Sequence, residues 1–228
     1  MSSKKVVITG SEGLIGSKLK EHLNDKYEVI GLDIKLGHDL CDEKIVRKFF
    51  ETAGDVYGVI QCHAYNPLPI AGADKVEPID VPLSELTDYL HVNVTSAFDV
   101  CRNFIRYNNS GRIINISSMY GVVSPKHPIY NNFTKHIGYS LSKSSVCMLS
   151  KYLASYYADS YQINTVILGG IYEESFDKSF VSKYEDNVPC GRMMNLEEVP
   201  PVFDFLLDEN NTYTTGTELV LDGGWTSW

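Results

Sequence analysis

Short runs of strand-forming residues alternate with longer amphipathic segments along this 228-residue chain. Alternation of this kind predicts βαβ units, in which helices join parallel strands and cover both faces of their sheet. Because such crossovers are right-handed, we expect a doubly wound α/β domain with a mostly parallel sheet of six to seven strands. The expected strands are residues 6–8, 27–32, 56–60, 112–116, 163–168 and 218–221, and the expected helices are residues 14–23, a segment capped by Asp42, and residues 83–107, 137–157 and 196–207.

Length and composition favour one domain over residues 1–228. At roughly 150 residues per domain, the chain is too short for two domains of ordinary size. Its 43% hydrophobic and 21% charged residues are ordinary for a globular protein. Residues 62–81 and 169–195 are long irregular connections, and loops of that length usually serve as lids or binding loops.

The charge and cysteine patterns exclude several classes of partner. The 20 basic and 29 acidic residues give a net charge of −9, which offers no electrostatic footprint for nucleic acid. No apolar run approaches the ~18–20 residues of a membrane span, and the run after Lys5 is too short for a signal peptide. The five cysteines are scattered and odd in number, which predicts a cytoplasmic protein without a metal site.

The first expected strand ends in a glycine-rich turn directly before a helix. Glycines there permit a tight turn and a close approach of the backbone to a pyrophosphate, which the helix N-terminus then binds through its N–H groups. A glycine-rich turn alone is weak evidence, but its place between the first strand and the first helix favours a dinucleotide. The expected cofactor-binding residues are Gly10, Ser11, Glu12, Gly13, Leu14, Ile15 and Gly16.

Asp33 ends the second expected strand. A carboxylate at this place hydrogen-bonds both hydroxyls of an adenosine ribose and repels a 2′-phosphate. The alternative is an aspartate that only forms a turn, and Lys35 nearby weakens the exclusion of NADP. The pattern favours NAD as the cofactor.

Tyr139 and Lys143 stand four residues apart in an expected helix, which places the phenol and the ammonium on one face. A tyrosine with a pKa of ~10 is a poor base at neutral pH, but a nearby ammonium stabilises the phenolate and lowers that pKa. With 15 tyrosines in the chain the spacing can arise by chance, so position decides. The preceding expected strand delivers Ser117 and Ser118 to the sheet edge where ligands of open α/β folds bind.

Taken in order, these motifs resemble the short-chain dehydrogenase/reductase family over essentially the whole chain. The resemblance implies a single Rossmann-type domain that transfers hydride between NAD(H) and a secondary alcohol or ketone. It also implies a homodimer or homotetramer, formed through the helical stretches 83–107 and 137–157 and through the C-terminal strand with Trp225 and Trp228. It rests on Thr9–Gly16, Asp33, Asp39-Leu40, Asn93–Phe98, Ser118, Tyr139-x-x-x-Lys143, Leu168–Ile171 and Leu221–Trp225.

The family mechanism assigns roles to four of these residues. Tyr139 is implied as general acid or base, and Lys143 as the group that lowers its pKa and binds the nicotinamide ribose. Ser118 is implied to hold the substrate oxygen; we choose it over Ser117 because the family's serine lies three residues before a glycine, here Gly121. Asn93 is implied to position a water in a proton relay.

The resemblance also implies further cofactor contacts. Asp39 and Leu40 match the pair that contacts adenine, and Ile171 follows a Gly169-Gly170 turn and would lie by the nicotinamide carboxamide. His63 and Ala64 occupy the family's Asn-Asn-Ala-Gly segment, which here reads Cys62-His63-Ala64-Tyr65.

The chain departs from the family pattern in other places as well. Asp39 follows Asp33 by only six positions, so we expect the helix between the family's second and third strands to be missing and the third strand to be a stub. The glycine spacing is that of the family's extended branch. Ser118 and Tyr139 lie 21 residues apart, and this insert resembles bacterial members of surface-polysaccharide and flagellin sugar pathways, which implies a sugar substrate. Candidate contacts for substrate hydroxyls or a phosphate are Lys126, His127, Tyr130, Asn131, Asn132 and His136.

Two alternative functions remain open from the sequence. The glycine spacing is also that of nucleotide-sugar epimerases and dehydratases, which keep NAD tightly bound. The altered residues at Cys62–Tyr65 and Leu168 suit a catalytically idle cofactor-binding protein, although Ser118, Tyr139 and Lys143 then have no physical reason to be present together.

Overall fold

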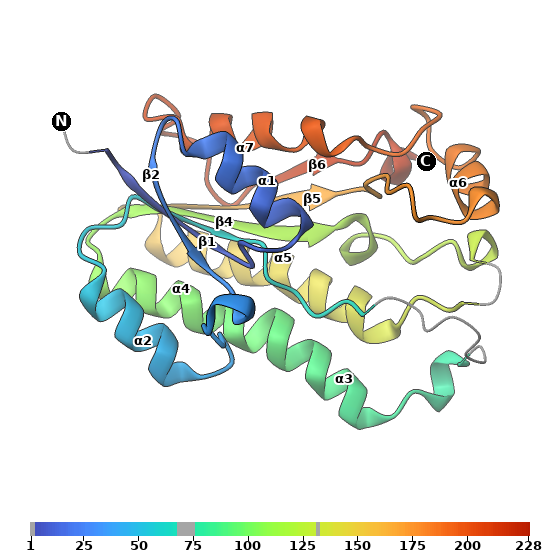
Figure 1. Cartoon of the computed structure of the whole chain (residues 1–228), viewed down its shortest axis with the longest axis horizontal. Helices are drawn as coiled ribbons and strands as arrows, with labels where there is room; N and C mark the ends of the chain where they lie inside the picture. The colour runs from blue at the N-terminus through green and yellow to red at the C-terminus, as the bar shows by residue number, and fades with distance from the viewer. Residues whose placement is uncertain (1–2, 68–75, 131–132) are drawn as a thin grey trace.

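The computed structural model describes residues 3–67, 76–130 and 133–228, and it contains a parallel sheet flanked by helices (Figure 1). Within those residues the sheet has six strands in the order β2-β1-β3-β4-β5-β6. This arrangement confirms the doubly wound fold. The strands are β1 (Lys5–Thr9), β2 (Glu28–Leu32), β3 (Gly58–Gln61), β4 (Gly111–Ser118), β5 (Tyr161–Leu168) and β6 (Glu218–Leu221).

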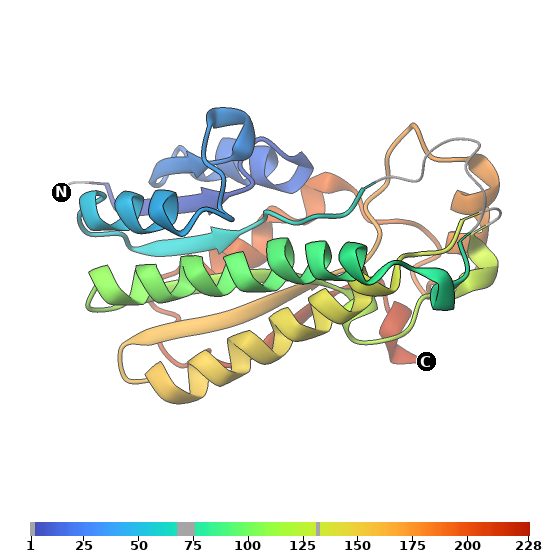
Figure 2. The same cartoon turned by 90° about the horizontal axis from the view of Figure 1, so that it is seen from below.

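The helices form one layer on each face of the sheet (Figures 1 and 2). Helices α1 and α7 cover one face, and α2, α4 and α5 cover the other. No helix in the described part of the chain has the length and apolarity needed to cross a bilayer. The helices are α1 (Leu14–Leu23), α2 (Glu43–Thr52), α3 (Leu83–Leu90), α4 (Ser96–Tyr107), α5 (Ile137–Tyr157), α6 (Lys178–Glu185) and α7 (Pro200–Leu207).

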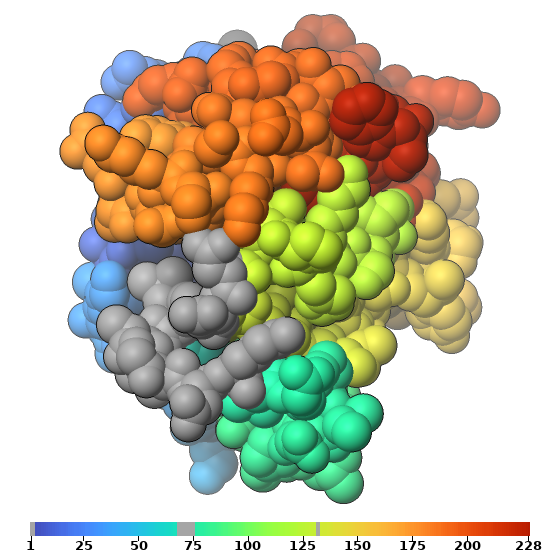
Figure 3. All heavy atoms as spheres, turned by 90° about the vertical axis from the view of Figure 1, so that its right-hand side faces the viewer, coloured from blue at the N-terminus to red at the C-terminus, as the bar shows by residue number. Residues whose placement is uncertain are grey.

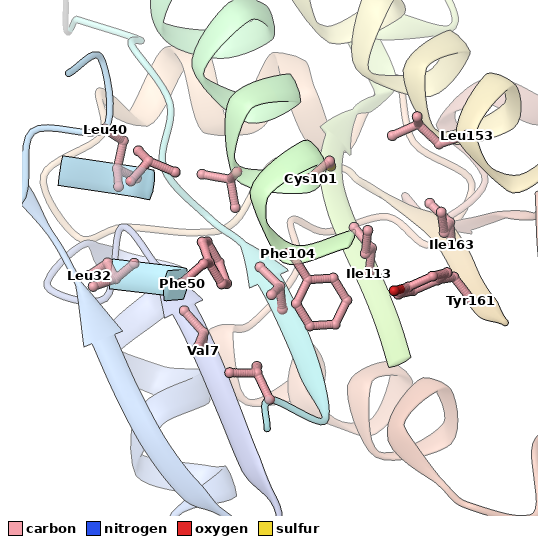
Figure 4. Close-up of a cluster of buried hydrophobic side chains, with 14 of the residues drawn as sticks. Val7, Leu32, Leu40, Phe50, Cys101, Phe104, Ile113, Leu153, Tyr161 and Ile163 are labelled. Atoms are coloured by element: carbon pink, nitrogen blue, oxygen red, sulfur yellow. The ribbon is translucent and has the colours of Figure 1, made fainter. Parts of the chain in front are cut away.

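Strand β1 is buried on both faces because its apolar residues alternate between two cores. Val7 points into a cluster with Phe50 and Phe104 under α2 and α4, as Figure 4 shows. Val6 and Ile8 point the other way, into the cluster beneath α1 and α7. A continuous apolar run is the expected composition of a strand inside a parallel sheet.

The segment between Leu32 and Asp42 contains a single 3-10 turn, Ile34–Leu36. The predicted absence of a helix there is confirmed, and the expected stub of a further strand does not form. A parallel crossover needs about a dozen residues or more, which this segment lacks. Strand β2 therefore lies at the edge of the sheet.

Three helical predictions needed correction. The expected helix 83–107 is interrupted by a π-helical turn at His91–Thr95, and the expected helix 196–207 divides into a 3-10 turn and α7. Two adjacent prolines, Pro200 and Pro201, begin α7, where the lack of an N–H group costs no helical hydrogen bond. Helix α6 was not predicted; Asp177 caps it by accepting from the N–H groups of Ser179 and Phe180.

Candidate active site

The carboxyl ends of β1, β3, β4 and β5 meet at one end of the sheet (Figure 1). The next strand after β1, β2, lies on one side of it, and the strand after that, β3, lies on the other side. The direction in which successive strands are added to the sheet therefore reverses at β1. Open α/β sheets bind ligands in the crevice outside such a reversal. A hollow of about 870 Å³ at the opposite, amino end of the strands lies away from all the predicted catalytic residues.

The glycine-rich turn is shaped by two close backbone approaches. Gly10 has φ = +64°, and a Cβ there would lie 2.6 Å from the backbone nitrogen of His63. A Cβ at Gly16 would lie 2.1 Å from the carbonyl oxygen of Gly10. Helix α1 begins after Gly13 with no side-chain cap, so its first N–H groups lack helical partners. The turn therefore fits a pyrophosphate.

Asp33 lies buried beside this turn. Its carboxylate accepts hydrogen bonds from the backbone N–H groups of Glu12 (3.0 Å) and Lys35 (2.9 Å). The Glu12 carboxylate lies on the same turn and forms an ion pair with Lys20 (3.1 Å). The two residues predicted to contact adenine differ in their surroundings. Leu40 is buried in the core, which leaves only its backbone for a cofactor, and Asp39 accepts from the N–H of Cys41.

His63 joins the end of β3 to the end of β1 and to α4. Its Nδ1 lies 2.6 Å from the Thr9 hydroxyl and its Nε2 lies 2.9 Å from the Ser96 hydroxyl. Because Ser96 donates to the carbonyl of Val92 (2.6 Å), it accepts from Nε2–H, and Nδ1 accepts from Thr9. The network requires a neutral imidazole. Burial and the charge of Lys143 lower the pKa of His63 to about 4.

Asn93 lies on the π-helical turn, a feature that often marks functional sites. Its side-chain amide donates to the carbonyl of Tyr65 (3.0 Å) and to the hydroxyl of Ser142 (2.9 Å) and accepts from the N–H of Tyr65 (2.5 Å). The amide thus ties the segment after β3 to α5. A role in holding a relay water stays a prediction.

The two serines at the end of β4 point in different directions. Ser117 donates to the carbonyl of Lys143 (2.8 Å), and a Cβ at Gly121 would lie 2.8 Å from its hydroxyl oxygen. Ser118 accepts from the N–H of Tyr120 (3.2 Å) and hydrogen-bonds Tyr139. Ser118 is therefore the serine that lies with Tyr139.

Tyr139 and Lys143 share one side of α5, but the expected lowering of the phenol pKa does not appear. Burial raises the pKa of Tyr139 and outweighs the opposing hydrogen bond from Ser118. The Lys143 ammonium donates to the carbonyl of Ile116 (2.9 Å) and lies 5.9 Å from the centre of the Tyr139 ring. Burial lowers the pKa of Lys143 to about 8.

Sequence reasoning missed Lys135, whose ammonium lies closer to Tyr139 than that of Lys143. Its Nζ is 4.1 Å from the centre of the Tyr139 ring and donates to Oδ1 of Asn66 (2.6 Å). Burial, with a smaller contribution from the charge of Lys143, lowers the pKa of Lys135 to about 8. The sequence signal that could have revealed it is the position of Lys135 in the insert, four residues before Tyr139.

The insert between Ser118 and Tyr139 packs against α6 and α3 at this end of the molecule (Figure 3). Tyr130 stacks on Phe180 of α6, with ring centres 5.4 Å apart, and donates to the Tyr120 hydroxyl (2.8 Å). His127 lies in the 3-10 turn His127–Ile129. Of the other predicted substrate contacts, Asn131 and Asn132 lie outside the described residues.

Two further predicted contacts serve the chain's own structure. His136 caps α5 by accepting from the N–H of Gly138 (3.0 Å) and pairs with Glu85 (3.2 Å). The Lys126 ammonium lies 4.8 Å from the ring of Trp225. Trp225 is buried against Tyr184, with ring centres 4.7 Å apart, so the prediction that it forms a subunit interface is wrong.

The Gly169-Gly170 turn is held by the C-terminal part of the chain. Gly169 donates to the carbonyl of Leu221 (2.8 Å), and Gly170 donates to the hydroxyl of Tyr184 (2.7 Å). Ile171 then pairs with Met194 in an isolated bridge. The turn comes directly after β5 and therefore lies at the same edge of the sheet as Ser118, which ends β4.

Comparison with known proteins identifies the family. A family profile described as enoyl-(acyl carrier protein) reductase matches residues 6–226. The chain belongs to the short-chain dehydrogenase/reductase family. It is therefore an oxidoreductase of the kind that acts on CH–OH groups.

Named relatives of this short-chain dehydrogenase/reductase are distant. Post-translational flagellin modification protein A of Campylobacter coli is 25% identical over 92% of this chain and 83% of its own. The 3-oxoacyl-(acyl-carrier-protein) reductase of Aquifex aeolicus is 29% identical over 96% and 86%. A short-chain dehydrogenase from Leptospira borgpetersenii, solved with bound NAD⁺, is 26% identical over 99% and 94%, with a TM-score of 0.86.

The neutral state of His63 predicts how the free energy of unfolding depends on pH. In the unfolded chain a histidine takes up a proton near pH 6.5, whereas folded His63 resists protonation down to about pH 4. Stability is therefore lost as the pH falls through this window, by up to about 3 kcal/mol from this residue.

Urea unfolding between pH 7 and pH 4 measures this effect. We expect His63→Asn to flatten the pH dependence relative to the unsubstituted chain, whatever its stability at pH 7. The exposed His91, replaced by glutamine, is the control. An unchanged slope in His63→Asn would show that His63 takes up its proton over the same pH range in the folded and the unfolded chain, which contradicts the prediction.

Proposed function

We propose that this protein interconverts a secondary alcohol and a ketone with NAD(H), using Tyr139 as general acid and base. The observation that carries the proposal is the meeting of Tyr139, Ser118 and Lys143 beside a turn that fits a dinucleotide pyrophosphate. A nicotinamide cofactor, when bound, supplies or accepts the hydride.

The residues divide the proton chemistry between them. In reduction the Tyr139 hydroxyl gives its proton to the substrate oxygen, and in oxidation the phenolate takes it back. The Ser118 hydroxyl holds the same oxygen. A phenol whose pKa is raised by burial is a poor base, so oxidation requires the positive charge of Lys143 near the phenolate. Asn93 holds the segment after β3 against α5. Its proposed role is to position, with Lys143, a water that passes on the proton.

A sugar or nucleotide sugar is the proposed substrate class. The 25% identity to a flagellin modification protein supports it, as does the insert between Ser118 and Tyr139. Aromatic rings of the insert and α6, among them Tyr130 and Phe180, form an apolar cluster against Tyr139. Such rings suit the CH faces of a sugar.

The proposed cofactor is NAD rather than NADP. Asp33 places a carboxylate beside the turn that receives the adenosine ribose, where it would repel a 2′-phosphate, whereas the Glu12 carboxylate on the same turn is paired with Lys20. The Lys35 ammonium donates to the carbonyl of Glu12 (3.2 Å) and so brings a positive charge near the turn, but Asp33 is the group that accepts directly from the backbone of the turn.

We also propose a homodimer or homotetramer in the cytoplasm. Apolar side chains form an exposed stripe along α5, and the largest are Met148 (63% exposed), Tyr152 (69%) and Tyr156 (75%). A stripe of this kind suits burial against a second copy. All five cysteines are free, which supports a reducing compartment.

Replacing Tyr139 with phenylalanine tests the mechanism. The variant lacks the proton donor, so kcat should fall by about 10²–10⁴-fold. Because the phenyl ring keeps the packing, NADH binding should stay within about threefold by calorimetry. Tyr130→Phe, which loses a hydroxyl in the same aromatic cluster, is the matched control and should remain active. Undiminished kcat in Tyr139→Phe would refute the proposal.

Replacing Asp33 with serine tests cofactor choice. Loss of the ribose hydrogen bonds should weaken NAD binding about 10- to 100-fold, as expected for hydrogen bonds to a charged group. Binding of NADP should weaken less or improve, because a repulsive charge is removed. Titration calorimetry with both cofactors measures the ratio, with the exposed Asp25→Ser as control. An unchanged NAD/NADP ratio contradicts the assignment.

Light scattering after gel filtration tests self-association. The unsubstituted chain should elute at two or four times its 25.6 kDa mass. The double substitution Met148→Glu and Tyr152→Glu should shift the mass downward, because it buries two charges in the proposed interface. Tyr213→Glu, at a fully exposed residue outside α5, should leave the mass unchanged. A monomeric unsubstituted chain would reject this interface.

A further inference from the structure

Two lysine ammoniums flank the ring of Tyr139, and the proposed reaction uses one of them. Lys143 lies 5.9 Å from the ring centre and Lys135 lies 4.1 Å from it. Lys135 comes from the insert, and within the described part of the chain its Nζ hydrogen-bonds only Oδ1 of Asn66, at 2.6 Å. An amide oxygen carries no charge to neutralise the ammonium.

Positive charge is therefore in excess here. Among the residues that the structure describes, neither Lys135 nor Lys143 forms an ion pair. The nearby Glu85 pairs with His136. Burying a cation without an anionic partner is unfavourable, and the pKa of both lysines is lowered accordingly, to about 8.

The Lys135 charge can either be stabilised by the Tyr139 ring or bind an anion. An ammonium over the face of the Tyr139 ring is a cation–π contact, which gives only part of what a carboxylate partner would give. Its contact with Tyr139 is with the face of the ring, whereas Ser118 is the group that hydrogen-bonds the hydroxyl. An anionic ligand beside Tyr139 would neutralise the charge that the described residues leave without an anionic partner.

We propose that Lys135 binds an anionic group of the substrate, a carboxylate or a phosphate, that lies within a few bonds of the carbon being oxidised or reduced. This inference rests on the proposed function, since it assumes that Tyr139 marks the reacting carbon. It narrows the substrate class to an acidic compound, such as a sugar acid or a sugar phosphate.

Titration calorimetry with malonate and with inorganic phosphate tests the anion site without turnover. The protein is first saturated with NADH, so that the glycine-rich turn is occupied and cannot bind either probe. We expect one or both probes to bind the unsubstituted chain, and the tighter one identifies the group as carboxylate or phosphate. Binding should weaken at least about tenfold in Lys135→Met and stay within about threefold in Lys135→Arg.

The control is Lys44→Met, which removes the same charge from the exposed start of α2 and should bind the probes normally. Circular dichroism checks the fold of each variant. If Lys135→Met does not fold, the comparison uses Lys135→Gln. Equal binding with and without the Lys135 charge, or no binding of either probe to the unsubstituted chain, overturns the proposal.

A kinetic comparison separates this proposal from the proposed function. The ratio of kcat/KM for 3-hydroxybutyrate to that for its methyl ester, or for glucose 6-phosphate to that for glucose, should fall about tenfold or more in Lys135→Met. Turnover of neutral alcohols in preference to acidic ones would reject the anion site and leave the oxidoreductase intact. Loss of the proposed function, with no turnover of any alcohol, leaves the calorimetric result to decide the anion site alone.

Discussion

The parallel pairing of β1, β3 and β4 is the constraint on which the candidate site depends. Thr9, Gln61 and Asn115 lie side by side in register, so the residues that follow them emerge at one level of the sheet. Gly10 can then meet the backbone of His63 with no room for a side chain. A slip of one residue would turn every side chain to the opposite face and separate these groups.

At this edge of the sheet, hydrogen bonds from His63 replace those that the family's Asn-Asn-Ala-Gly segment makes. In place of the family's amides at this point, a neutral histidine connects Thr9 at the end of β1 to Ser96 on α4. The same stretch of helix carries the π-helical turn that turns Asn93 toward Tyr65 and Ser142. Two linked sets of hydrogen bonds therefore hold the segment after β3, where the family motif is missing.

Charge is distributed unevenly along the site. The Asp33 carboxylate lies at the end proposed to receive adenosine, and the ammoniums of Lys135 and Lys143 lie at Tyr139. Under the proposed function, a cofactor without a 2′-phosphate suits the end at Asp33, and an acidic substrate suits the end at Lys135. Screening by salt is weak in a partly buried site, so this difference in charge would favour each ligand at its own end.

Local chemistry made most of the fold predictable from the sequence. The apolar runs, the glycine turn at Gly10–Gly16 and the short Asp33–Asp39 connection depend on backbone geometry and on the period of burial, which neighbouring residues specify. The same holds for the i, i+4 spacing of Tyr139 and Lys143. Helix α6 lacked a strong local signal, because its position follows from packing against Tyr130 and Trp225.

Side-chain direction and solvation had to come from the tertiary structure. Adjacent Ser117 and Ser118 are chemically identical and point to opposite faces because side chains alternate along β4, and the position of α5 leaves Ser118 beside Tyr139. The raised pKa of Tyr139 follows from burial, which its spacing from Lys143 does not reveal. The sequence by itself determined the doubly wound sheet and the residues at its edge. Only the tertiary structure decided which of those groups meet and that Lys135 joins them, because burial and contact between distant segments exist only once the chain has folded.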